Sequence, residues 1–284
     1  MYRFELILQP FSFAIHTNNA KVFSKLQQLY PESVLSAQNS HLFIDFNIEF
    51  FEQGLFKKHF DFRCANRQFR QCEFDNIVST IEWGLNWTLS SFQNYYLCIH
   101  AAVLERRGVT VVLPAPPGSG KSTLCSLLML SGWRLLSDEH CLVDLSSHQI
   151  VPAVRPIAIK NKSFSVISNW FPNESLLAVQ TNTLKGSVGY LAPTEQSWQQ
   201  RSQLAKPSYI VLPQYSRQAI PTDFSDVAKS AMTLELIKNS FNYQTLGKQG
   251  FDALTRLVEL SQCKKLTYHT TTEALALFEG LLDV

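Results

Sequence analysis

Apolar residues in the middle of the chain recur first with the period of a strand and then with that of a helix. Residues 95–104 and 109–113 are both rich in apolar side chains, which predicts two strands joined by a tight turn at 106–108. Leucines recur at helical spacing over residues 121–131, and Gly132 follows where a helix would end. The pattern predicts a strand pair that leads through a turn into a buried helix.

The residues before this strand pair predict a small α+β region. Apolar alternation predicts strands at 11–15 and 41–46, with a helix at 20–29 between them. A longer helix is predicted over 77–92, with its aromatic side chains in the core. We therefore expect a small α+β region over residues 1–85, with a soft boundary to the rest of the chain.

The residues after the buried helix predict alternating strands and helices. A strand at 133–137 carries Asp138 and Glu139 at its carboxyl end. Alternation of this kind makes an α/β domain the expectation for residues 86–284. The further elements predicted are strands at 141–145, 149–154, 209–212 and 265–269, a strand and helix within 157–170, and helices at 225–240 and 272–282.

The turn at 114–123 has the composition of a phosphate-binding loop. It matches the G-x-x-x-x-G-K-[ST] motif except that Ala115 stands at the first glycine. Gly118 and Gly120 allow successive amides to point at a phosphate, and the helix start adds its positive dipole end. Lys121 can reach the β and γ phosphates of a nucleoside triphosphate, and Ser122 can place its hydroxyl on magnesium. The predicted nucleotide contacts are Ala115, Pro116, Pro117, Gly118, Ser119, Gly120, Lys121, Ser122 and Thr123.

Two carboxylates and a histidine stand at spacings that would bring them to this loop. Asp138 and Glu139 follow Lys121 by 17 and 18 residues. This short interval favours a compact kinase arrangement over a motor or transporter ATPase, in which Glu139 would polarise water. His100 precedes Lys121 by 21 residues and is predicted near the mouth of the same site, as an orienting or charge-stabilising group. His140 is expected on the opposite strand face, packed locally.

Composition and charge narrow the classes of function. The 284 residues are 45% hydrophobic and 17% charged, which is typical of one large or two small globular domains. A formal net charge of +2, without Lys and Arg runs beyond pairs, argues against nucleic acid as a partner. We expect no secretion signal, no membrane span and a cytoplasmic location. The six cysteines form no C-x-x-C pair and are expected to be reduced.

The order and spacing of His100, the loop and Asp138-Glu139 resemble the catalytic core of bacterial HPr kinase/phosphorylase, a phosphate-loop protein kinase. Further segments resemble the HPr kinase-related kinase A family, and together they span most of the chain. These segments are EWGLNW (82–87), HAA (100–102), PAPPGSGKST (114–123), GWRLLSDE (132–139), RPIAIKN (155–161) and SFNY (240–243).

The resemblance implies an α/β fold with a phosphate-loop kinase core of the HPr kinase/PEP carboxykinase type and a mixed sheet. It implies ATP and Mg²⁺ as cofactors. In this resemblance Lys121 holds the phosphates and Ser122 the magnesium. Asp138 acts as base or metal partner, and His100 assists at the acceptor hydroxyl.

The resemblance also bears on partners. Arg155 and Lys160 match the Arg-Pro-Ile segment of the family and would reach acidic groups of the nucleotide or the acceptor; bridging of surface carboxylates is the alternative. The implied acceptor is a peptide, a small protein or a sugar, and a homo-oligomer is compatible because HPr kinases are hexamers.

The leading hypothesis is an ATP-dependent kinase that phosphorylates a hydroxyl. The alternatives are an ATP-binding scaffold without transfer and a simple ATPase.

Overall fold

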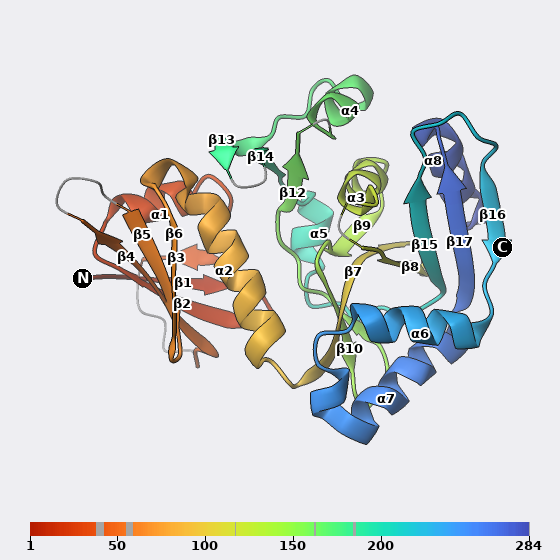
Figure 1. The fold of residues 1–284 in the computed structure, drawn as a ribbon, viewed down its shortest axis with the longest axis horizontal. Coiled ribbons are helices and arrows are strands. Elements are labelled where there is room, and N and C mark those ends of the chain that lie inside the picture. The colour runs from red at the N-terminus through yellow and green to blue at the C-terminus, as the bar shows by residue number, and fades with distance from the viewer. Residues whose placement is uncertain (38–42, 55–58, 117, 162, 184–185, 284) are drawn as a thin grey trace. The chain divides into compact units, whose positions relative to one another are not determined.

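The computed structural model describes residues 1–37, 43–54, 59–116, 118–161, 163–183 and 186–283. The protein is a mixed α/β protein with three sheets that contain parallel and antiparallel pairs (Figure 1). The chain divides into two compact units, and the predicted boundary at residue 85 stays a prediction. The first unit comprises Met1–Phe92, Ala158–Ser168 and Asn173–Ala192, and the second comprises Gln93–Ile157, Asn169–Pro172 and Pro193–Val284.

The first unit is built on a six-stranded sheet of order β3-β1-β2-β4-β5-β6. Helix α2 (Ile77–Phe92) contacts β5 and β6 because its apolar residues recur at helical spacing along one face. A smaller sheet of order β12-β14-β13 follows later in the chain. The remaining elements of these segments are β1 (Tyr2–Ile7), β2 (Ser12–Thr17), α1 (Lys21–Leu26), β3 (Leu35–Ser36), β4 (Phe46–Gln53), β5 (His59–Cys64), β6 (Arg67–Cys72), a 3-10 turn (Phe74–Asn76), β12 (Ile157–Lys160), α4 (Ser163–Trp170), β13 (Leu177–Thr183) and β14 (Gly186–Leu191).

The second unit is built on a sheet of order β11-β10-β7-β8-β15-β17-β16, with β9 also paired to β7. The strands β8, β15 and β17 run parallel to one another, and the other pairs are antiparallel. Its elements are β7 (Tyr96–Arg106), β8 (Val109–Pro114), α3 (Lys121–Leu130), β9 (Arg134–Ser137), β10 (His140–Asp144), β11 (Ile150–Val151), α5 (Glu195–Gln199), β15 (Tyr209–Tyr215), β16 (Asp223–Asp226), α6 (Lys229–Asn239), α7 (Tyr243–Leu260), β17 (Gln262–Tyr268) and α8 (Thr271–Gly280).

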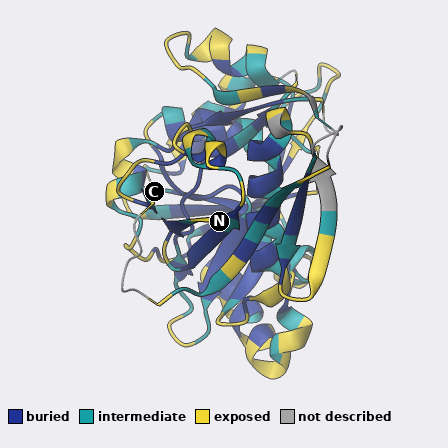
Figure 2. Ribbon diagram, turned by 90° about the vertical axis from the view of Figure 1, so that its left-hand side faces the viewer, coloured by how far each residue is buried: buried dark blue, intermediate teal, exposed yellow. Residues whose placement is uncertain are grey.

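The core of the second unit lies between its sheet and the helices α6 and α7. Buried side chains of β7, β8 and β15 meet those of both helices in one cluster. Figure 2 shows buried residues concentrated along the strands, while exposed residues lie on helix faces and loops. Burial on both faces explains why β7 and β8 are apolar along nearly their whole length.

Most elements predicted from the sequence are confirmed, including the β7–β8 pair, α2, α3, β9 and α8. The strand predicted at 41–46 is wrong in its bounds: residues 41–42 lie outside the described residues, and β4 begins at Phe46. The helix predicted at 225–240 begins at Lys229, because residues 223–226 instead pair with β17. The sequence pattern did not predict β1 or α7.

Candidate functional site

The loop between β8 and α3 has the backbone geometry that its glycines predict. Gly118 and Gly120 have φ angles of 85° and 92°, in the left-handed region that favours glycine. Gly120 caps α3, and its carbonyl accepts the first helical hydrogen bond, from the Leu124 amide at 3.0 Å. Ala115 is buried, so its methyl group fits a packed position at the end of β8. Pro117 lies outside the described residues.

Asp138 and Glu139 lie in a gap between two strands that both pair with β7. Strands β9 and β10 both pair with β7, and the bend at Asp138 and Glu139 separates them. Ser137 lies opposite Val103, and β10 resumes opposite His100. At the same level of β7, Ala101 lies opposite the last residue of β8. The interruption therefore presents both carboxylates beside the start of the loop.

Lys121 contacts this bend. Its Nζ atom donates to the backbone carbonyl of Asp138 at 2.5 Å and lies 3.2 Å from Nε2 of His100. The same Nζ is 3.9 Å from the carboxylate of Glu139. Only 7% of the Lys121 side chain is exposed, so its charge acts in a desolvated place where electrostatic interactions are strong.

Ser122 forms a second link between the loop and the bend. Its hydroxyl donates to Oδ2 of Asp138 at 2.9 Å. Two oxygen ligands so close together suit Mg²⁺, which binds through one or two protein oxygens together with phosphate oxygens and water. Within the described residues, no group of three or more His, Cys, Asp and Glu side chains could hold a metal without such help.

Glu139 is an ionised carboxylate that lies close to His100 and Lys121. Its Oε2 atom lies 3.0 Å from Nε2 of His100. Burial alone would raise the pKa of Glu139, but the hydrogen bond with His100 and the charge of Lys121 outweigh it, so this pKa lies well below its usual range. Glu139 therefore remains negatively charged at neutral pH.

His140 lies on the same face as His100, which corrects the expectation that it faces the other way. The two histidines are directly opposite each other in the antiparallel β7–β10 pair, and such partners project to one side of a sheet. Both rings pack near Phe241, with ring centroids 6.0 and 5.6 Å away. Burial, reinforced by the charge of Arg155, lowers the pKa of His140 to about 3.

The structure brings five of the predicted residues into one cluster. The cluster consists of His100, Lys121, Ser122, Asp138 and Glu139. Arg155 is buried in the same unit, close enough to influence His140. Lys160 ends β12 and belongs to the first unit.

Two tyrosines next to the loop were missed by sequence reasoning. A Cβ atom at Gly120 would lie 3.4 Å from Cβ of Tyr215 and 3.4 Å from the hydroxyl of Tyr268. These residues end β15 and β17, which run parallel to β8. The signal was available, because parallel strands place their carboxyl ends at one edge of a sheet.

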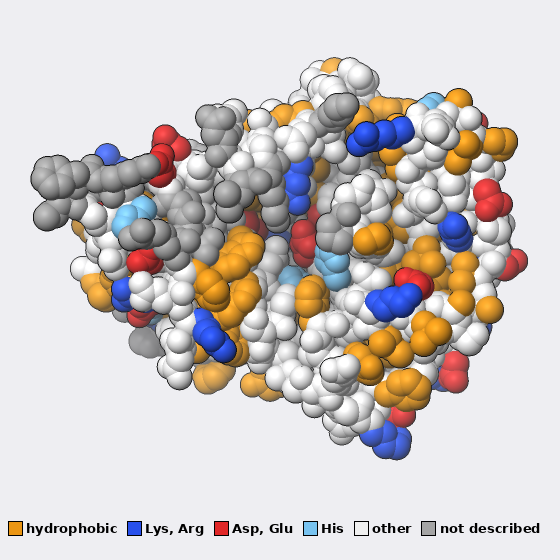
Figure 3. All heavy atoms as spheres, viewed as in Figure 1, with side chains coloured by type: hydrophobic (Ala, Val, Ile, Leu, Met, Phe, Trp, Pro, Cys, Tyr) orange, Lys and Arg blue, Asp and Glu red, His pale blue; other side chains and the backbone are white. Residues whose placement is uncertain are grey.

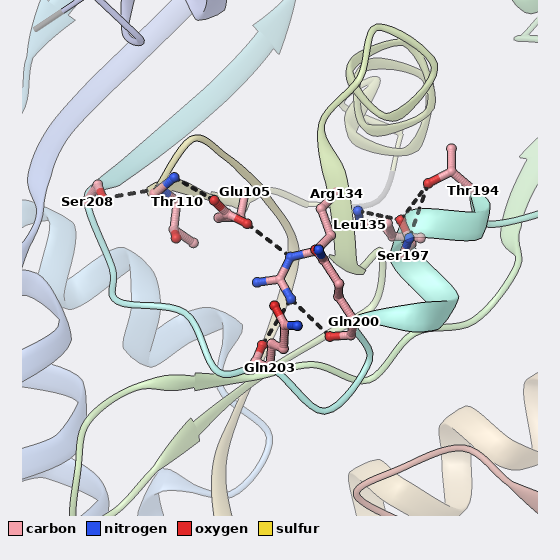
Figure 4. Close-up of polar contacts among 10 residues, drawn as sticks. Glu105, Thr110, Arg134, Leu135, Thr194, Ser197, Gln200, Gln203 and Ser208 are labelled. Atoms are coloured by element: carbon pink, nitrogen blue, oxygen red, sulfur yellow. Dashed lines mark hydrogen bonds and ion pairs between the residues drawn. The ribbon is translucent and has the colours of Figure 1, made fainter.

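A buried arginine supports the strand that carries the acidic bend. Figure 4 shows Arg134 of β9 reaching toward β7 and toward the chain after α5. Its Nε atom donates to Glu105 at 3.0 Å, and Nη1 donates to the carbonyls of Gln200 and Gln203, each at 3.0 Å. The next residue of β9, Leu135, donates its amide to Ser197 at 2.9 Å. These bonds hold β9 in place from both sides.

The surface and the cysteines add little to the chemistry of the site. On the face seen in Figure 3, Lys and Arg side chains are scattered among neutral ones. The five cysteines whose side chains are described are free and buried, as expected for reduced residues. No helix in the described part of the chain is both long and apolar enough to cross a bilayer.

Comparisons with known proteins give no identification. A scan against protein-family models finds no match, and a search of curated proteins finds none either.

Proposed function

We propose that this protein is an ATP- and magnesium-dependent kinase that transfers the γ-phosphoryl group to a hydroxyl group. The observation that carries the proposal is the meeting of Lys121 and Ser122 with the Asp138-Glu139 bend, at hydrogen-bonding distance. A glycine loop that opens a helix supplies phosphate ligands, and the adjoining carboxylates supply the groups that phosphoryl transfer needs. The proposed fold type is the HPr kinase/PEP carboxykinase type, which the sequence resemblance supports.

In this proposal the loop and Lys121 hold the phosphates. The amides after Gly118 and the positive end of α3 would bind the phosphates, and Lys121, whose Nζ now donates to the Asp138 carbonyl, would neutralise their charge. Because Lys121 is nearly buried, its charge is poorly screened by water. Phosphoryl transfer depends mainly on such positioning and charge neutralisation.

Ser122 and Asp138 are the residues that would hold magnesium. When bound, the ion neutralises charge on the phosphate oxygens and helps to orient them. Ser122 Oγ and Asp138 Oδ2 already share a hydrogen bond, so both oxygens point to one place. Asp138 is therefore assigned to the metal side of the site rather than to the acceptor.

His100 and Glu139 are assigned to the acceptor hydroxyl. The low pKa of Glu139 makes it a weak base, which suits a group that accepts a hydrogen bond from the hydroxyl and orients it. A loose transition state needs little removal of the proton before transfer. His100, whose Nε2 atom lies within hydrogen-bonding distance of both Glu139 and Lys121, keeps the carboxylate in position.

One alternative also has support in the geometry. Glu139 is ionised and 29% exposed, so it could orient water instead of an acceptor, and the protein would then be an ATPase. A scaffold that binds ATP without consuming it is the other alternative. The three functions differ in the fate of the γ-phosphoryl group.

The test follows that group from γ-labelled ATP. Wild-type protein is incubated with magnesium and an extract of its own host, beside Asp138→Asn and the control Asp252→Asn, whose carboxylate lies exposed on α7. We expect label on an acceptor with wild type and Asp252→Asn, and its loss with Asp138→Asn while ATP still binds. Free labelled phosphate without transfer would favour the ATPase, and bound but intact ATP would favour the scaffold. An active Asp138→Asn variant would refute the role of Asp138.

A further inference from the structure

A second group of side chains borders the loop on the side away from His100. Strand β8 lies between β7, which carries His100, and β15. Beyond β15 lies β17, and the two strands end at Tyr215 and Tyr268. Tyr209 and Ile210 pair with β8, so the last residues of β15 extend past the end of β8 and run beside the loop. In Figure 1, β15 and β17 run side by side in the same direction.

Tyr215 is fixed to the loop by its backbone. Its amide donates to the carbonyl of Ser119 at 3.4 Å, and its Cβ atom lies near Gly120. The amide contact does not require an aromatic side chain, because any residue except proline supplies it. The ring must therefore be explained separately.

The Tyr215 ring is held by other rings but remains accessible. It lies nearly parallel to the imidazole of His269, at 12° and 6.5 Å between centroids, and edge-on to Tyr268 at 5.6 Å. The imidazole is itself fixed, since its Nδ1 lies 3.0 Å from the carbonyl of Ser216. Yet Tyr215 is 48% exposed, whereas Tyr268 is 5% exposed. An aromatic face that is held in place and open to solvent is a surface on which another ring can stack.

We infer that Tyr215, supported by His269, is the stacking platform for the base of the nucleotide. The inference rests on the proposed function. In that function the γ phosphate lies toward His100 and Glu139, on the β7 side of the loop. The nucleoside then leaves the loop on the other side, where Tyr215 offers an exposed ring next to Ser119 and Gly120. Stacking is tolerant of base identity, so the platform binds purines without strict selection between them.

The test compares a ligand that has a base with one that lacks it. Binding of MgATP and of magnesium triphosphate is measured by calorimetry for wild type, Tyr215→Ala and Tyr215→Phe. Tyr95→Ala serves as the matched control, since Tyr95 is 69% exposed and precedes β7. We expect Tyr215→Ala to weaken ATP at least about fivefold and to leave triphosphate within about twofold. Tyr215→Phe, which keeps the ring, should bind both ligands as wild type does.

The outcomes separate this inference from the proposed function. Equal weakening of ATP and triphosphate by Tyr215→Ala would show that the side chain only supports the loop, and unchanged ATP binding would place the base elsewhere. Either result overturns the platform while the phosphate site stands. Wild-type protein that binds triphosphate as tightly as it binds ATP would also overturn the platform. Wild-type protein that binds neither ligand would overturn the proposed function itself, and the platform with it.

Discussion

One nitrogen atom of His100 couples the cation and the carboxylate of the site. Nε2 lies 3.0 Å from Glu139 and 3.2 Å from Lys121. A protonated Nε2 donates to Glu139, whereas an unprotonated Nε2 accepts from Lys121, so one nitrogen cannot make both hydrogen bonds at once. The position of this proton therefore selects the partner of His100. A ligand that draws Lys121 away leaves His100 bonded to Glu139.

His140 should make the stability of the protein depend on pH. The pKa of His140 is about 3 in the folded protein, while an unfolded histidine titrates near about 6.5. Below pH 6.5 the unfolded state binds the extra proton, so the free energy of unfolding falls as the pH falls toward 3, by at most about 1.4 kcal/mol per pH unit. This stabilisation is fully present above pH 6.5.

The measurement is urea unfolding of the metal-free protein at pH 7, 6 and 5. Wild type should lose more stability than His140→Gln over this range, because the variant has no imidazole to protonate. Parallel losses in the two proteins would show that His140 does not carry the effect.

The sequence predicts which residues gather near the loop better than it predicts where their side chains point. The motif and its spacing were sufficient to bring Lys121, Ser122 and Asp138 together as candidates. Strand alternation could not predict to which face of the sheet His140 points, because the bend at Asp138 and Glu139 breaks the alternation between β9 and β10. Which side chains share a face then depends on pairing with β7.

At the scale of elements, the site depends on β9 keeping its place on β7. The strand has only four residues, and all four are buried. Arg134 ties it both to Glu105 of β7 and to the carbonyls of Gln200 and Gln203 (Figure 4). The acidic bend begins directly after this short strand.

Replacing Arg134 with Met should destabilise the second unit by roughly 3 kcal/mol, because the partly buried carboxylate of Glu105 and two carbonyls lose their donor. Thermal or urea unfolding measures the loss. Arg256→Met is the control, since that arginine forms an exposed ion pair on α7 and should change stability by no more than about 0.5 kcal/mol. Equal effects of the two substitutions would contradict the anchoring role of Arg134.

The helix that the sequence pattern did not predict shows the limit of periodicity at this scale. Residues Ala253, Leu254, Leu257 and Val258 of α7 are buried at helical spacing, so part of the signal was present. Gly247 and Gly250 weaken helix propensity in the first half, and Gly247 has a φ of 57° that interrupts the helix there. Packing of α7 against the sheet of the second unit stabilises a helix whose intrinsic helix propensity is low.

At the scale of the molecule, the first unit is assembled from separate stretches of chain. Gln180 of β13 links two of them, since its Oε1 accepts from the Ser79 amide at 3.0 Å and its Nε2 donates to the carbonyl of Asp75. Ser79 lies in the first turn of α2, and Asp75 lies in the 3-10 turn directly before it. No composition shift in the sequence marks such an assembly, because it depends on contacts between residues about 100 positions apart.

Replacing Gln180 with Leu should destabilise the start of α2 by about 1 to 3 kcal/mol, because the buried Gln180 amide no longer bonds to the Ser79 amide and the Asp75 carbonyl. Hydrogen exchange at residues 77–80 should become faster, while binding of MgATP stays at the wild-type level. Gln199→Leu is a suitable control, since that exposed side chain bonds to exposed Glu195 in the preceding turn. Unchanged exchange in Gln180→Leu would refute the link.

Calorimetric titration with MgATP shows whether Lys121 and its loop form a nucleotide site. Wild-type protein is compared with Lys121→Ala and with Lys248→Ala, whose lysine is 86% exposed on α7. We expect one MgATP per chain in wild type and Lys248→Ala, and at least tenfold weaker binding in Lys121→Ala. Equal binding by all three proteins, or none by wild type, would contradict this expectation.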